Sequence, residues 1–109
     1  MGKPNEVLLS DERGPAPGWT FLTNHAHVLI CLWQNPDLRM REVAQAVGIT
    51  ERAVQKIVVD LEGERYLSRR KTGRRNRYSV RLRRPLRHSL EDHLRIGDLM
   101  QLISESGPK

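Results

Sequence analysis

Cysteine is nearly absent from this chain, since Cys31 is the only one among 109 residues. A single cysteine cannot form an internal disulfide, which excludes a disulfide-stapled fold and favours a reducing cytoplasm. Long apolar runs are also missing, so the sequence offers no candidate for a membrane span or for the apolar core of a signal peptide. The length suits one domain built around one hydrophobic core.

Acidic residues are scarce in one part of the chain. The sequence carries 19 Lys and Arg against 13 Asp and Glu, a net charge of +6. No acidic residue occurs between Glu64 and Glu91, whereas ten arginines and one lysine fall in that interval. Crowded like charges favour a polyanionic partner, and the planar arginine fork fits phosphates and guanine edges. The alternative is a solvated basic face, or one that pairs with acids brought close by folding.

Catalytic motifs are missing as well. The sequence has no glycine-rich phosphate loop, no nucleophile motif and no convincing pair of carboxylates, so we expect neither an enzyme nor a cofactor. His27 and Cys31 would share one helix face and could form half of a soft-metal site. No second pair of ligands follows at metal spacing, so we assign no metal site and expect Cys31 to be a core residue.

Residues 41–61 contain a helix-turn-helix pattern. Apolar residues recur at helical spacing up to Gly48, which predicts a left-handed helix end, and Thr50 offers a hydroxyl to cap a second helix. Gly63 is the expected end of that second helix. Its predicted inner stripe is formed by Val54, Ile57, Val58 and Leu61. The pattern is typical of a DNA-binding motif with the second helix as reader, and an ordinary helical hairpin is the alternative.

A β-hairpin is predicted directly after this motif. Residues 66–71 favour a strand, residues 72–76 have turn chemistry, and residues 77–83 alternate strictly between apolar and polar. Tyr78, Val80 and Leu82 fall on one side of the second strand, and arginines occupy most of the other side. The hairpin should therefore have an apolar inner face and a cationic outer face.

The flanking segments complete the predicted order. Residues 1–18, rich in proline and glycine, are expected to form a flexible arm. Apolar spacing from Thr23 to Trp33 predicts a helix that ends before Pro36, followed by a brief extended link at 38–40.

After Pro85, Leu86, Leu90 and Leu94 stand four apart, which predicts one helix and then another beyond a break near Gly97. We therefore divide the chain into an arm (1–18), a DNA-binding domain (19–84) and a C-terminal helical segment (85–109) that could serve dimerisation.

This order of elements resembles the small bacterial or archaeal winged-helix regulators of the MarR/ArsR-like group. The resemblance rests on MREVAQAVGITERAVQKIVVDL for the helix-turn-helix and on GRRNRYSV for the wing, with weaker support from WTFLTNHAHVLICL and PLRHSLEDH. It implies a mainly α fold with a small β-hairpin: a three-helix core plus a wing, followed by C-terminal helices. It further implies that the second helix of the motif lies in the major groove and that the wing approaches the adjacent minor groove.

The residues expected to contact DNA form two groups. In the reading helix they are Thr50, Arg52, Gln55 and Lys56. Thr50 and the first-turn amides can hold a phosphate, Arg52 can grip guanine, Gln55 can grip adenine, and Lys56 extends this face toward phosphate. In the wing they are Arg69, Arg70, Lys71, Arg74, Arg75 and Arg77. Arg74 and Arg75 are placed at the tip, for the minor groove, and the others along the DNA backbone.

The function expected from these features is that of a cytoplasmic, sequence-specific regulator that binds double-stranded DNA. A homodimer is expected because a lone winged helix reads only a few base pairs. Its apolar surface would be formed by Leu94, Leu99, Met100 and Ile103, with help from Val7 to Leu9. The same stripe could instead cover the core of its own subunit. Non-specific DNA binding, RNA binding and a protein-interaction module are the alternative functions.

Overall fold

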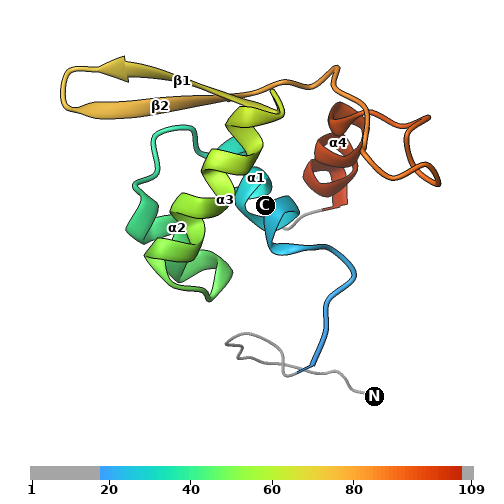
Figure 1. Ribbon diagram of the computed structural model, residues 1–109, viewed down its shortest axis with the longest axis horizontal. Helices are drawn as coiled ribbons and strands as arrows, with labels where there is room; N and C mark the ends of the chain where they lie inside the picture. The colour runs from blue at the N-terminus through green and yellow to red at the C-terminus, as the bar shows by residue number, and fades with distance from the viewer. Residues whose placement is uncertain (1–17, 107–109) are drawn as a thin grey trace.

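The computed structural model describes residues 18–106, so nearly all of the expected arm, including Val7 to Leu9, lies outside the described residues. The elements are α1 (Asn24–Gln34), α2 (Met40–Val47), α3 (Glu51–Gly63), β1 (Leu67–Thr72), β2 (Arg75–Val80) and α4 (Ile96–Ser106). Figure 1 shows the hairpin projecting past α2 and α3 on one side, whereas α4 lies on the other side. The predicted fold class, mainly helical with one small antiparallel hairpin, is confirmed. None of the described helices has the length and apolar character needed to cross a membrane.

Helix α3 is the centre of the hydrophobic core. Its predicted inner stripe is buried, and the helix contacts α1, α2 and β1. The other helices and the hairpin add Val28, Leu29, Leu32, Val43, Ala44, Tyr66, Leu67, Tyr78, Ile96 and Met100 to this core. Because one face of α3 is enclosed in this way, its opposite face is left to solvent.

The turn between α2 and α3 forms as predicted. Gly48 adopts a left-handed conformation (φ 87°, ψ 33°), and the N–H groups of Gly48 and Ile49 both donate to the Ala44 carbonyl, at 2.8 and 3.1 Å. The Thr50 hydroxyl then accepts the amide N–H of Ala53 at 3.0 Å. The two helices are therefore joined by a closed, fully bonded turn.

Helix α3 ends at Gly63, as predicted. Gly63 is the last helical residue rather than the residue at which the chain reverses. The reversal occurs at Arg65, which has a positive φ of 66°, and the Tyr66 N–H then donates to the Leu61 carbonyl at 2.9 Å. The bonding of Tyr66 into the core thus holds an arginine in a conformation that normally favours glycine.

The hairpin turn is tighter than predicted. Thr72 pairs with Arg75, so only Gly73 and Arg74 form the loop, and residues 75 and 76 already belong to β2. Gly73 has a φ of 64°, and a glycine with positive φ at the first loop position is typical of a two-residue hairpin turn. The second strand accordingly starts and ends earlier than expected, at Arg75 and Val80.

The segment after the hairpin corrects another expectation. Residues 81–95 form turns rather than the predicted helix, and Leu90, meant for its inner stripe, is 79% exposed. The Leu86 N–H donates to the Leu94 carbonyl at 2.9 Å, which closes this segment into a loop. Gly97 does not interrupt a helix but lies in the first turn of α4, where a Cβ atom would come within 3.1 Å of the Leu82 carbonyl oxygen. One described helix, α4, therefore follows the hairpin.

The two glycines of the helix-turn-helix should respond oppositely to alanine. Gly48→Ala places a side chain at positive φ and should lower the free energy of unfolding by about 1 kcal/mol. Gly63→Ala, in a helix with no atom within 4 Å of the added Cβ, should leave it unchanged or raise it by about 0.5–1 kcal/mol. Urea unfolding followed by circular dichroism measures both, and equal losses in the two variants would contradict this account of the turn.

Candidate nucleic-acid interface

The outer face of α3 brings together the residues predicted for the reading helix. Arg52, Gln55 and Lys56 are exposed, and their spacing of three and four places them on one face. Val59 continues this face one turn later with 66% of its surface exposed. Val59 is not among the residues predicted for the reading helix. An apolar side chain among polar ones on such a face can pack against a thymine methyl group.

Thr50 lies at the start of this helix with its hydroxyl oxygen already used as a cap. The hydroxyl proton stays available to a phosphate, as do first-turn N–H groups that no carbonyl of the helix accepts. Glu51 is exposed in the same turn and adds one negative charge there. The start of α3 can therefore hold a phosphate while the next turn faces the bases.

The wing cations fall into two sets, which the sequence did not distinguish. Arg77 donates through Nη1 to both carboxylate oxygens of Asp37, at 2.9 and 2.8 Å. Arg75 donates through Nη2 to the backbone carbonyl of Asp37 at 2.7 Å. Arg69 pairs through Nε with Glu62 of α3 at 3.2 Å. These three arginines are held by the body of the protein.

The remaining wing cations project without a partner. The side chains of Arg70, Lys71 and Arg74 are exposed, and none of them makes a hydrogen bond or ion pair within residues 18–106. Arg74 occupies the second position of the turn, at the tip of the hairpin. Arg70 lies directly opposite Arg77, a like-charge pair whose repulsion is relieved by Asp37.

Some arginines of the basic interval have a structural role at the base of the wing. The Arg84 guanidinium lies 5.3 Å from the centre of the Tyr66 ring and donates through Nη2 to the Glu64 carbonyl at 3.1 Å. The Tyr66 hydroxyl in turn donates to the Pro85 carbonyl at 2.6 Å. The basic interval therefore contains cations that bond the hairpin to the rest of the protein and cations that extend from it into solvent.

The histidines and the cysteine of α1 have other partners. His25 Nε2 lies 2.9 Å from Asp60 Oδ2 of α3, and His27 Nδ1 lies 3.2 Å from Asn24 Oδ1. Cys31 is half-buried, and this burial raises the pKa of its thiol because the charged thiolate loses solvation. Across the described part of the chain, no three metal-ligating side chains come together.

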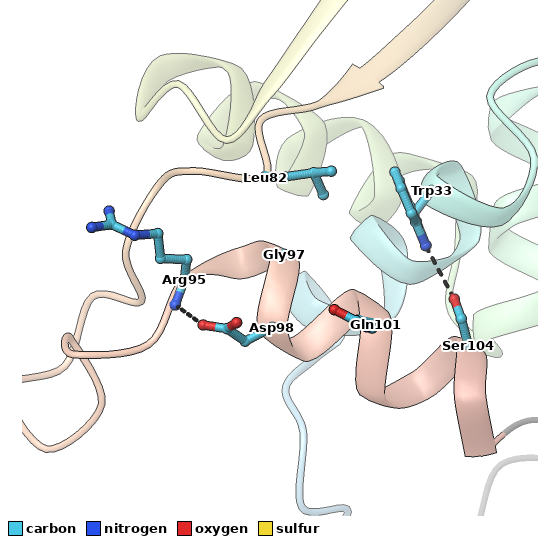
Figure 2. A pocket seen from close by; sticks show the side chains of 7 residues that line it. All are labelled: Trp33, Leu82, Arg95, Gly97, Asp98, Gln101 and Ser104. Carbon is cyan, nitrogen blue, oxygen red and sulfur yellow. Dashed lines mark hydrogen bonds between the residues drawn. The ribbon is translucent and has the colours of Figure 1, made fainter.

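A hollow of about 440 Å³ lies beside α4, and Figure 2 shows its lining. It is lined by Trp33, Leu82, Arg95, Gly97, Asp98, Gln101 and Ser104. Its two charged side chains are engaged locally: Asp98 accepts the Arg95 N–H at 2.8 Å, and Arg95 Nη1 donates to the Arg83 carbonyl at 2.9 Å. Trp33 Nε1 of α1 donates to Ser104 Oγ of α4 at 3.3 Å, so the hollow lies where these two helices contact each other.

No protein-family model and no curated protein matches this chain. Among solved structures it is similar to MepR, a transcription regulator of the Staphylococcus aureus multidrug efflux pump MepA, with a TM-score of 0.50 and 19% sequence identity. The match covers 75% of this chain and 57% of the MepR chain. The fold is a winged helix. At this identity the likeness shows the fold alone, and the chain spans just over half the length of that protein.

Proposed function

We propose that this protein binds double-stranded DNA as a sequence-specific transcriptional regulator, with α3 in the major groove and the wing on the adjacent minor groove and backbone. The observation that carries the proposal is that α3 has an exposed polar face and packs against a hairpin that carries unpartnered cations. Figure 1 shows the hairpin extending past α2 and α3, on the side of the molecule away from α4. A helix fits the major groove, and the narrow minor groove attracts arginine.

In this proposal, the side chains of α3 determine which DNA sequence is bound. Arg52 can bond a guanine through two N–H groups, Gln55 can bond an adenine edge, and Val59 can pack on a thymine methyl. Lys56 and Thr50 serve the phosphates on either side. No wing residue is needed to distinguish bases in the major groove.

The wing supplies most of the sequence-independent affinity for DNA in this proposal. Six cations and two carboxylates, Asp37 and Glu62, leave it with a net charge of +4. Arg74 at the tip has no partner within the described residues, and Arg75 retains its charge because its partner is a neutral carbonyl. These two arginines are the candidates for the minor groove.

The likeness to MepR supports a regulatory rather than a catalytic role. MepR is described as a transcription regulator, and this chain shares its winged-helix fold over three quarters of its own length. Non-specific DNA or RNA binding remains an alternative, which the binding experiments below distinguish.

We further propose that the protein acts as a homodimer. The stripe expected to form the interface is largely used within the subunit, since Met100 is fully buried and Leu99 and Ile103 are half-buried. Of that stripe, Leu94 is exposed, at 43%. Larger exposed apolar side chains lie elsewhere: Leu102 is 60% exposed, and Trp19 and Phe21 form an edge-to-face pair at 4.9 Å with 73% and 91% exposure. A second copy that covered these residues would remove apolar surface from water and would give the assembly two α3 helices, as recognition of two half-sites requires.

Neutralising the wing tip should weaken binding to every duplex. Arg74→Ala with Arg75→Ala should cost about 1–3 kcal/mol of binding free energy and flatten the slope of log K against log salt by about two charges. Fluorescence anisotropy titrations at several salt concentrations measure both quantities. An unchanged slope would remove the wing from the interface.

Changes on α3 should alter preference rather than salt dependence. Arg52→Ala and Gln55→Ala should each cost about 1–3 kcal/mol on the preferred duplex and little on unrelated duplexes. The preferred duplex would come from selection out of a random pool. If selection by the wild type yields no enriched sequence, or if RNA competes equally, the sequence-specific assignment is wrong.

The dimer is tested by light scattering. The wild type should have twice the monomer mass at tens of micromolar. Phe21→Ser with Leu102→Ser should lower that mass, because the variant lacks the apolar side chains that a second copy would cover. Leu90→Ser, in the exposed loop before α4, is the matched control and should leave the mass unchanged. A wild-type monomer at this concentration would contradict the dimer.

A further inference from the structure

The loop between α1 and α2 forms a short, stiff support along the free edge of the wing. Asn35 holds it from within, because its side-chain oxygen accepts the Asp37 N–H and its carbonyl accepts the Leu38 N–H, both at 3.2 Å. The Pro36 carbonyl then accepts the Tyr78 N–H of β2 at 3.1 Å. This bond places Asp37 beside the second strand, and Figure 1 shows the loop directly below the hairpin.

Asp37 engages two arginines of this strand at once. Arg75 and Arg77 are two residues apart and so lie on the same face of β2. The Asp37 carboxylate binds Arg77 through both of its oxygens, at 2.8 and 2.9 Å, while its carbonyl accepts from Arg75 at 2.7 Å. One residue of the helical body therefore orients two cations of the wing.

The electrostatic consequences for the two arginines differ. The carboxylate offsets the charge of Arg77 and eases its repulsion with Arg70, directly opposite on β1. The carbonyl leaves the charge of Arg75 intact but restricts its motion. Both Asp37 and Arg77 are more than half exposed, so a phosphate that approached Arg77 would also meet the Asp37 carboxylate. Arg77 thus contributes little net attraction to DNA even where DNA reaches it.

We propose that Asp37 limits the affinity of the wing for the DNA backbone, as an internal counter-ion that offsets Arg77 and orients Arg75. The proposal rests on the proposed DNA-binding function. Attraction to phosphates contributes to the binding of every duplex, whereas base contacts contribute only to the preferred one. A carboxylate fixed beside the wing lowers the phosphate contribution and leaves the contacts of α3 in place. Asp37 thereby lowers the affinity and its salt dependence for all duplexes alike, and base contacts make up a larger share of the binding free energy.

The test is Asp37→Asn, which keeps the shape of the side chain and removes its charge. Arg77 would then be available to phosphate, so affinity for an unrelated duplex should rise and the slope of log K against log salt should steepen by about 0.9. The ratio of affinities for the selected and the unrelated duplex should stay the same, because the added phosphate contact is common to both. Glu91→Gln is the matched control, because it removes one negative charge from the loop before α4 and should leave the slope unchanged.

A double-mutant cycle assigns the effect to Arg77. Arg77→Ala alone leaves the Asp37 carboxylate uncompensated and should weaken binding to every duplex, whereas Arg77→Ala combined with Asp37→Asn should return the slope to that of the wild type. Two results would overturn the proposal. One is weaker binding of Asp37→Asn to every duplex with no steeper slope, which indicates a purely structural role. The other is a double variant whose slope stays as steep as that of Asp37→Asn, which would show that Arg77 is not the cation that Asp37 offsets.

A measurement without DNA separates this inference from the proposed function. In the unbound protein, the side-chain Nη resonances of Arg77 should show slow rotation by ¹⁵N NMR in the wild type and fast rotation in Asp37→Asn. Fast rotation in the wild type would refute the counter-ion. Failure of the wild type to bind any duplex, with slow rotation at Arg77, would instead refute the DNA-binding function.

Discussion

The packing of the inner stripe of α3 is the constraint on which the rest of this structure depends. Val54, Ile57, Val58 and Leu61 contact elements from α1 to β1, and each such burial contributes roughly 1.5–3 kcal/mol. The rotation of α3 about its axis is therefore set by the core rather than by its polar residues. Because α3 turns one side inward, the stripe from Arg52 to Val59 must face outward. The proposed reading surface is thus a consequence of core packing, and its orientation is as rigid as the core itself.

The wing depends on this core in a second way. A two-stranded hairpin is only marginally stable by itself, and this one has an apolar anchor at its base alone, in Tyr66, Leu67 and Tyr78. Beyond that anchor, the hairpin carries six cations that repel one another, five on its strands and Arg74 in its turn. Glu62 and Asp37, from the end of α3 and from the loop before α2, supply the opposing charges. The hairpin is therefore fastened by apolar burial at one end and by counter-ions along its length.

The sequence predicted well the features that depend on local chemistry. Gly48 and Thr50 act within one turn of their own positions, so the helix-turn-helix could be placed almost to the residue. Features that depend on distant partners could not be foreseen. Arg77 and Asp37 are 40 residues apart, and no spacing signals their pairing. The four-residue spacing from Leu86 to Leu94 was misread as a helix because backbone bonds across a loop override it. For the candidate site, the sequence thus indicated candidate residues, which the structure leaves exposed, but not which wing cations are engaged.

The division of the basic interval bears on how such a small domain could choose its DNA. If every cation between Glu64 and Glu91 were free, affinity would be dominated by phosphate attraction, which is the same for all sequences. Folding reduces that attraction selectively: Arg69 and Arg77 meet carboxylates, and Arg84 lies over Tyr66. The charges left without a partner in the described wing, at Arg70, Lys71 and Arg74, lie toward the tip. A wing of moderate net charge lowers affinity for every duplex alike, so the base contacts that α3 would make form a larger share of the binding free energy. The acids that pair with the wing therefore matter to the proposed function as much as the arginines do.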